Sequence, residues 1–394
     1  MSVQRSSRAW MSHHLGIKPA ASRTVASKVK GLIAWVLVAA VIVLVSGRWV
    51  QELVSGRQQD FIVYITASRD WLAGRSVYQD RSALPYTYPP LTAILFLPFA
   101  LMPDSLAMTV WVGGNLALGM WIVRRLFPRQ PFWFMALVML SAPIGRSLYL
   151  GQINLVLFAL LLLDLIWTRR ASGAFVGFAA AIKVTPAFMA LTYLLRRDWR
   201  SSGIAIGAAA AWTLIAAATR PADSITYWTR LLWDPNRVGG LAYSDNQSIT
   251  GLLARLLDDP PGWARLFSTG VAIAVAVLAG YRWRRQPGSL EMVTIIGITG
   301  LLISPVSWTH HWIWLLTFQA ILIRRGHRGY AAALGVVLAV EPLLLAGLLT
   351  PLPQPLAAAL LSSYTVAGLG ALTYLGVCDP PPALCPFAQD AGSE

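Results

Sequence analysis

Acidic residues are scarce in this chain. Only 17 of its 394 residues are Asp or Glu, against 32 Lys and Arg, and charged residues of both signs make up 12% of the sequence. A soluble domain carries about a quarter charged residues. Apolar residues make up 56% of the chain, and the mean hydropathy is +0.58. The composition excludes an ordinary soluble protein and indicates an integral membrane protein.

Two further absences narrow the function. The only cysteines, Cys378 and Cys385, lie near the C-terminus without a neighbouring histidine, so neither a disulfide framework nor a zinc site is expected. The sequence has no GxxxxGK(S/T) or DxD-type motif, no GxGxxG after a strand, and no polar region long enough to form a nucleotide-binding lobe. If the chain uses a sugar donor, that donor is expected to reside in the membrane already, and no cofactor is expected.

Basic residues gather in short clusters between apolar runs. They are Arg124 and Arg125, Arg169 and Arg170, Arg196 to Arg200, Arg282 to Arg285, and Arg324 to Arg328. Such clusters mark the cytoplasmic ends of membrane helices, so the net charge of +15 reports topology. They are not interleaved with aromatics on one amphipathic face, which argues against a nucleic-acid partner.

Apolar runs that suit a hydrocarbon core of roughly 30 Å recur along the chain. They cover residues 31–50, 89–102, 106–123, 131–145, 152–168, 172–195, 203–219, 264–281, 289–304, 309–323, 329–349 and 353–376. We predict an all-α polytopic membrane protein with one domain, residues 31–376, and outer loops at 51–88 and 220–263. A basic cytoplasmic segment, residues 1–30, precedes it, and a Pro-rich tail, residues 377–394, follows it.

Two of these runs are irregular. Residues 89–102 begin with two prolines, and residues 172–195 are interrupted by Lys183, Thr185 and Pro186. Proline removes a backbone donor and pushes the preceding residue out of the helical region. If the first run dips into the outer leaflet and the second is a hairpin entering from the cytoplasmic side, every basic cluster falls inside and about twelve crossings remain. The polar motifs then all face the outer side.

Asp60 follows the first apolar run in the segment SGRQQDFIVY. Helical spacing places Asp60 and Tyr64 on one face, where both could reach a cavity. An acid before an apolar periodic run is also a common helix start, and this explanation stays open.

Lys183, in AAAIKVTP, lies within an apolar run. An ionisable residue there is costly and normally faces a polar site, so Lys183 is a candidate ligand of an anionic lipid phosphate. The alternative is a lysine that extends to the membrane surface.

His310 and His311, in SPVSWTHHWIW, could donate to a phosphate or relay a proton. The alternative is that this motif is a set of aromatic side chains at the membrane interface, which needs no function.

Further candidates combine guanidinium, amide and phenol groups, which suit phosphate and sugar hydroxyls. They comprise Arg146, Gln152 and Asn154 in GRSLYLGQIN, Tyr88 in YTYPP, and Asn246 and Gln247 in SDNQS.

Six segments together resemble glycosyltransferase family 87. They are DFIVYITASRDWLAGRSVY, YPPLTAILFLPFALM, GQINLVLFALLLLDL, AAAIKVTPAFMALTYLLRRDWR, NQSITGLLARLL and LISPVSWTHHWIWLL. The resemblance implies the GT-C fold and transfer of mannose, or of arabinofuranose, from a polyprenyl phosphate to a lipid-linked or glycan acceptor of phosphatidylinositol mannoside or lipomannan type.

The resemblance also implies roles for individual residues. It implies that Asp60 is the catalytic carboxylate and that His310 or His311 meets the donor phosphate, with Lys183 and Arg146 at matching motif positions. Family members often carry Asp where this chain has Thr309. Inverting transfer from a phosphate needs one base and no acid, because the leaving phosphate is already a stable anion.

The leading hypothesis is therefore a mannosyltransferase of the cell membrane that acts on its outer face. Arabinofuranosyl transfer is the alternative within the same class. A transporter or flippase would also explain a broken helix with a buried charge, but it usually shows a matching break in its other half. No such counterpart to Lys183 occurs in residues 203–376.

Overall fold

The computed structural model describes residues 47, 51, 58–79, 84–167, 172–234, 237, 239–257, 262–283, 286, 289–340, 342, 349 and 351–378. These ranges are helical and contain no strand, apart from an isolated bridge between Asn246 and Trp308. Several predictions lie outside the described residues: the basic segment 1–30, the run 31–50 except residue 47, Arg169, Arg170 and almost all of the C-terminal tail.

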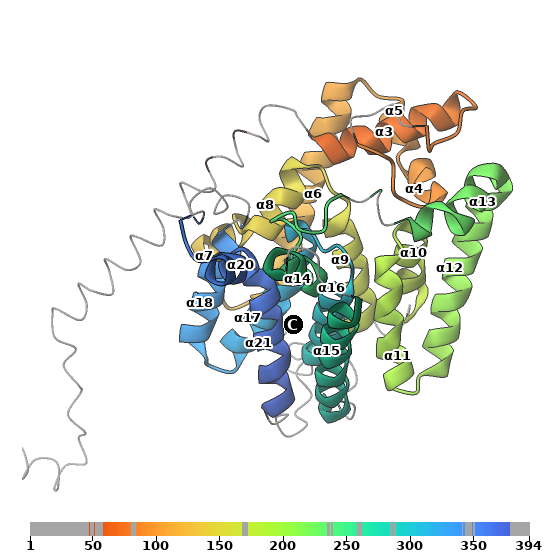
Figure 1. Cartoon of the computed structure of the whole chain (residues 1–394). Helices are drawn as coiled ribbons and strands as arrows, with labels where there is room; N and C mark the ends of the chain where they lie inside the picture. The colour runs from red at the N-terminus through yellow and green to blue at the C-terminus, as the bar shows by residue number, and fades with distance from the viewer. Residues whose placement is uncertain are drawn as a thin grey trace, which may run out of the picture. The chain divides into compact units, whose positions relative to one another are not determined.

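The helices follow one another along the chain as labelled in Figure 1. They are α3 (Gln59–Leu72), α4 (Pro90–Leu95), α5 (Leu97–Ala100), α6 (Asp104–Leu126), α7 (Phe132–Met139), α8 (Ala142–Tyr149), α9 (Asn154–Leu162), η1 (Leu163–Trp167), α10 (Ala174–Ile182), η2 (Thr185–Ala190), α11 (Leu191–Leu195), α12 (Trp199–Thr219), α13 (Pro221–Thr229), η3 (Leu231–Trp233), α14 (Ile249–Leu257), α15 (Gly262–Trp283), α16 (Leu290–Ile303), η5 (Thr309–Trp314), α17 (Leu315–Arg324), α18 (Arg328–Ala339), α20 (Gln354–Leu361) and α21 (Ser363–Val377).

Local sequence signals set many of these boundaries. The side chain of Asp198 accepts a hydrogen bond from the Ser201 backbone N–H at 3.0 Å and so caps α12. Ser289 caps α16 in the same way through Met292. The acid Asp104 lies in the first turn of α6, which complements the helix dipole.

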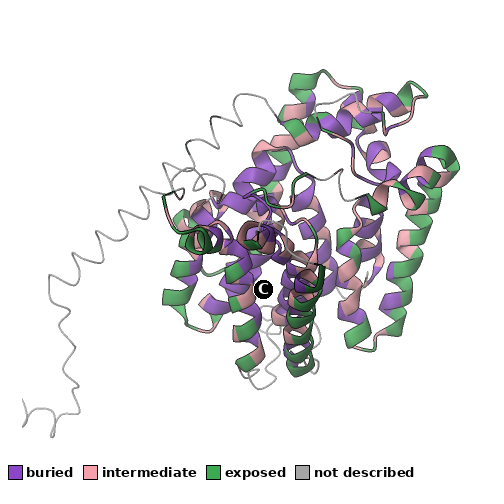
Figure 2. Cartoon of the chain, viewed as in Figure 1, coloured by how far each residue is buried: buried purple, intermediate pink, exposed green. Residues whose placement is uncertain are grey.

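Three described helices, α6, α12 and α15, are long and apolar enough to cross a membrane. The number rises to five if the bent pairs α7 with α8 and α20 with α21 are each one span. Leu266, Phe267 and Leu278 on α15 are 76%, 68% and 69% exposed, as expected for side chains that face lipid. Figure 2 shows much of this helix in the colour of exposed residues. The chain is a membrane protein, and the figure of about twelve crossings stays a prediction.

The break predicted at Lys183 is confirmed. Helix α10 ends at Ile182, and Lys183 is extended, with φ −148° and ψ 131°. The segment then doubles back through η2 and α11. The contact between its two ends shows this: the Gly173 N–H at its start donates to the Tyr193 hydroxyl near its end, at 3.0 Å. Lys183 therefore lies at the turn between α10 and η2, in the segment that runs from α10 to α11 in Figure 1.

The close packing of α10 on α12 depends on a glycine. A β-carbon on Gly177 would lie 2.2 Å from the carbonyl oxygen of Ala205 in α12.

The run 89–102 is not one span. It forms two short helices, α4 and α5, that meet at Phe96. Its predicted place in the outer leaflet stays a prediction.

Candidate active site

Asp60 lies in the first turn of α3, and its backbone anchors that turn. The N–H groups of Asp60 and Phe61 both donate to the carbonyl oxygen of Leu150, at 3.0 and 3.2 Å. The Asp60 carboxylate makes no cap with the helix and instead accepts a hydrogen bond from Gln152 Nε2 at 2.5 Å. Asp60 thus lies in the first turn of α3, as expected of an acid at a helix start, while its carboxylate bonds to another segment and does not cap the helix.

Gly151 allows α3 to approach so closely. Its φ is +70°, and a β-carbon there would lie 2.6 Å from the β-carbon of Phe61. The Gly151 carbonyl oxygen accepts a hydrogen bond from Trp111 Nε1 at 2.8 Å, and the Trp111 ring stacks on Phe61. The motif GQIN is thereby held against the start of α3.

Gln152 joins Asp60 to two buried phenols. The hydroxyls of Tyr64 and Tyr88 lie 2.8 Å apart, and each is 3.1 Å from Gln152 Oε1. All three side chains were predicted to bind substrate. The structure shows that their polar atoms contact one another and, through Gln152, the Asp60 carboxylate.

The pKa of the Asp60 carboxyl is raised to about 6, chiefly because burial removes water from its ionised form. The hydrogen bond from Gln152 and the positive charges of Lys183 and Arg146 partly oppose this shift, while Asp245 adds to it. Helix α3 lies outside the candidate membrane-spanning helices. A carboxylate with a pKa near neutrality suits a general base.

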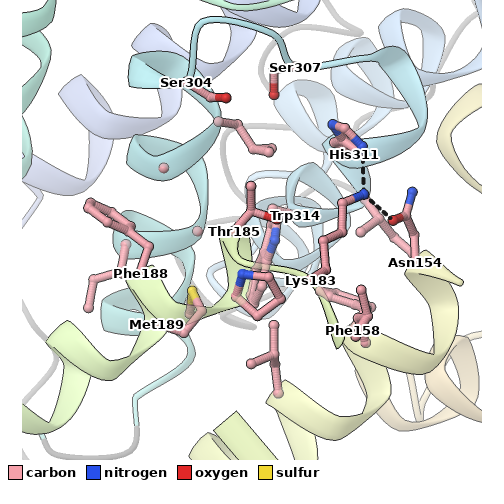
Figure 3. A pocket seen from close by; sticks show the side chains of 18 of the residues that line it. Asn154, Phe158, Lys183, Thr185, Phe188, Met189, Ser304, Ser307, His311 and Trp314 are labelled. Atoms are coloured by element: carbon pink, nitrogen blue, oxygen red, sulfur yellow. Dashed lines mark hydrogen bonds between the residues drawn. The ribbon is translucent and has the colours of Figure 1, made fainter. Parts of the chain in front are cut away.

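Lys183, His311 and Asn154 form the second part of the site, shown in Figure 3. The Lys183 ammonium donates to Asn154 Oδ1 at 3.2 Å and lies 3.1 Å from His311 Nε2. Because an ammonium only donates, Nε2 is the acceptor when Lys183 is charged. Lys183 therefore points into a polar site formed by Asn154 and His311.

These three residues line one wall of a cavity of about 350 Å³. Ser304 and Ser307 add polar groups nearby, and the remaining wall is mainly apolar (Figure 3). That apolar wall includes Leu157, Phe158, Phe188, Met189, Leu301 and Trp314. The cavity is polar at Lys183, its two partners and the two serines, and it is mainly apolar elsewhere, which suits a lipid with an anionic head group.

His310 is not among the residues that line this cavity and is only 3% exposed. Neither of its ring nitrogens has a hydrogen-bond partner among the described residues. The His310 and His311 rings meet edge to face, 4.5 Å between centroids. Since buried polar groups are normally paired, His310 is a candidate for contact with a ligand.

Arg146 pairs with an acid that the sequence analysis did not single out. Its guanidinium lies 3.0 Å from Asp245 Oδ2, and both side chains are buried. Asp245 also accepts hydrogen bonds from the hydroxyl of Thr309 and, through its carbonyl oxygen, from the Thr309 N–H. The only available signal was an isolated acid in SDNQS, within a chain that has few acids.

Asn246 and Gln247 were predicted to bind substrate, but their amides hold the protein's own backbone. Asn246 Oδ1 accepts from the N–H groups of Ser307 and Ser248, at 2.9 and 3.2 Å. Gln247 Nε2 donates to the carbonyl oxygens of Ser244 and Leu361, at 2.7 and 2.6 Å. Both residues are 0% exposed. The Asn246 amide fixes the SDNQS loop against the SWTHH segment, and the Gln247 amide ties the loop to Leu361. Substrate contact by either residue stays a prediction.

We expect Asp245→Asn to destabilise the protein strongly. It removes the negative charge that faces the buried Arg146, and breaking a buried ion pair costs about 3–5 kcal/mol. Asp104→Asn is the matched control, because its ion pair with Arg69 is exposed and worth about 0–1 kcal/mol. Thermal unfolding in detergent would measure both, and equal losses would contradict this assignment.

Within the described ranges, no three His, Cys, Asp or Glu side chains gather as they would around a metal ion. We therefore assign no metal ligands there.

Apolar helices and a buried polar site beside an amphipathic cavity define the class: a membrane-embedded enzyme. The model of glycosyltransferase family 87 matches residues 86–305, more than half of the chain. The chain belongs to this family and is a glycosyltransferase.

Two curated relatives show the similarity. The first, from Mycobacterium tuberculosis, is a polyprenol-phosphate-mannose-dependent alpha-(1-2)-phosphatidylinositol mannoside mannosyltransferase. It is 35% identical over 319 residues, which cover 71% of this chain and 73% of the relative. The second, from Mycolicibacterium smegmatis, is the corresponding pentamannoside mannosyltransferase and is 35% identical over 269 residues, 63% of this chain and 64% of its own length. No solved structure matches.

Proposed function

We propose that this chain transfers mannose from polyprenyl-phosphate-mannose to a lipid-linked acceptor of the phosphatidylinositol mannoside type. The names of the relatives support both substrates. We further propose the GT-C fold, a plasma-membrane location and a site that faces the outer side.

One observation supports the chemistry most directly: residues 152 to 154 connect the two parts of the site. Gln152 donates to Asp60, and Asn154 accepts from Lys183. The Cα atoms of Gln152 and Asn154 lie at most roughly 7 Å apart, and the positive charge of Lys183 acts on the Asp60 carboxyl. A carboxylate and a cationic phosphate site that contact the same short segment can act on one reacting sugar.

The mechanism is a single inverting displacement. Asp60 removes the proton from the acceptor hydroxyl as its oxygen attacks the anomeric carbon, and the bond to the donor phosphate breaks. The phosphate leaves with the electron pair, and its charge is stabilised by Lys183, by His310 or His311, and by Arg146. The polyprenyl chain would lie along the apolar wall of the cavity, since that surface matches a hydrocarbon.

A transfer assay tests the donor. Membranes that carry the protein are supplied with radiolabelled polyprenyl-phosphate-mannose and a phosphatidylinositol mannoside acceptor. We expect labelled, lipid-linked product. Transfer from polyprenyl-phosphate-arabinose alone would support the arabinofuranosyl alternative, and no transfer from either donor would overturn the proposal.

The proposed topology places the basic end of α6, at Arg124 and Arg125, in the cytoplasm. A single cysteine introduced beside Arg124 should stay unlabelled when intact cells are treated with a membrane-impermeant thiol reagent, and become labelled after permeabilisation. Labelling in intact cells would contradict the proposed orientation.

A further inference from the structure

Both the nitrogen and the oxygen of the Gln152 side-chain amide make hydrogen bonds. Its NH₂ donates to Asp60 Oδ2, and its Oε1 faces the hydroxyls of Tyr64 and Tyr88. An amide oxygen only accepts and an amide nitrogen only donates, so the two ends are not equivalent. Gln152 is only 5% exposed, and water has little access to it.

The two phenols determine which way the amide points. Their hydroxyl oxygens lie 2.8 Å apart, so one phenol donates to the other. The second phenol then still has its proton for Gln152 Oε1, whichever of the two it is. Oε1 therefore accepts a hydrogen bond from a phenol in either arrangement, and the NH₂ group is left facing the carboxylate.

We propose that Gln152 is a positioning residue, an inference that rests on the proposed function. Tyr64 and Tyr88 fix its amide so that the NH₂ group donates to one carboxylate oxygen of Asp60. The other carboxylate oxygen is then left for the acceptor hydroxyl. Asp60 Oδ1 makes no hydrogen bond within the described part of the chain. A hydrogen bond that is directed at the carboxylate stabilises its ionised form, which is the form a base needs.

The arrangement also excludes a competing state. If the amide could rotate, Oε1 would accept a hydrogen bond from the neutral Asp60 carboxyl and so stabilise the protonated form, which cannot act as a base. Three charged groups from other segments also shift the pKa of Asp60: Lys183 and Arg146 lower it, and Asp245 raises it. Those three groups are unchanged in the variants below, so a shift can be attributed to Gln152.

The test is the pH dependence of kcat. Gln152→Met has a similar length but no polar amide. The acidic limb of the profile is the range in which kcat falls as the pH is lowered. In Gln152→Met the midpoint of this limb should lie about one pH unit higher, because a hydrogen bond to a charged group is lost. The double variant Tyr64→Phe with Tyr88→Phe should shift the limb in the same direction, by more than the sum of the single variants, since either phenol alone can still donate to Oε1.

Tyr78→Phe is the matched control. Its hydroxyl donates to the backbone oxygen of Tyr88 at 3.0 Å and does not touch Gln152. This variant should leave the limb in place. Thermal unfolding of each variant in detergent separates a loss of fold from a shift of the profile.

Two results would overturn the proposal. One is loss of activity in Gln152→Met with the acidic limb at its wild-type position, which would indicate a structural role only. The other is a raised acceptor KM with an unchanged limb, which would show that Gln152 binds substrate directly. Failure of the proposed base is detected separately, because Asp60→Asn would then remain active whatever the Gln152 variants do.

Discussion

Asp60→Asn is expected to lower mannosyl transfer by about 10²- to 10⁴-fold, the usual contribution of a general base. Asparagine has nearly the same shape and can still face Gln152, but it cannot take a proton from the acceptor. The loss should appear in kcat, with little change in the KM of the donor, because Asp60 does not line the cavity that is proposed to hold the donor.

The pH profile of the wild type provides a second test of Asp60. Its pKa lies at about 6, so the base is mostly ionised at pH 7 and becomes protonated as the pH falls below 6. Activity should therefore fall on the acidic side, and the residual activity of Asp60→Asn should lack this limb. Asp104→Asn, which changes an exposed carboxylate on α6, should behave like the wild type. Equal transfer by Asp60→Asn and the wild type would refute the assignment.

Lys183→Met is expected to reduce kcat/KM for the donor by about 10²- to 10³-fold. Removing one preorganised group that stabilises developing charge typically has an effect of about this size. Lys183 lies at the turn between α10 and η2, where its ammonium contacts Asn154 and His311 at one wall of the cavity. The leaving phosphate would gain charge beside this group.

Lys183→Arg tests whether positive charge alone is sufficient at this position. It keeps the positive charge but replaces a compact ammonium by a planar fork, so we expect activity between that of Lys183→Met and the wild type. The KM of the acceptor should stay unchanged in both variants. If Lys183→Met loses thermal stability but keeps its donor kcat/KM, Lys183 has a structural role and the proposed phosphate site is wrong.

Several features of the fold could be read from local sequence. The end of α10 at Ile182 follows from Lys183 and Pro186, because a buried charge and a missing backbone donor both oppose a continuous helix. The long apolar helices α6, α12 and α15 follow from composition alone. The bend of 61° between α7 and α8 was not predicted, although Pro143 lies at the start of α8.

The polar contacts of the site could be predicted less well. Asp60, Lys183 and His311 were identified because each is an unusual residue type at an unusual place. Their pairings with Gln152 and Asn154 were not predicted, because a hydrogen bond across 92 residues, such as that from Gln152 to Asp60, leaves no local pattern. Asp245 was missed for the same reason: its partner Arg146 comes from a distant helix.

The amino-acid sequence by itself determined that this chain is a helical membrane protein and a member of glycosyltransferase family 87, since hydropathy and short motifs are local properties. Only the tertiary structure decided how the motif side chains are used. It directs Gln152 to Asp60 and the amides of Asn246 and Gln247 to the backbone, and it brings Lys183 to His311. The physical reason is that a polar side chain pairs with whichever group the packed helices bring within about 3 Å, and packing joins residues far apart in the chain.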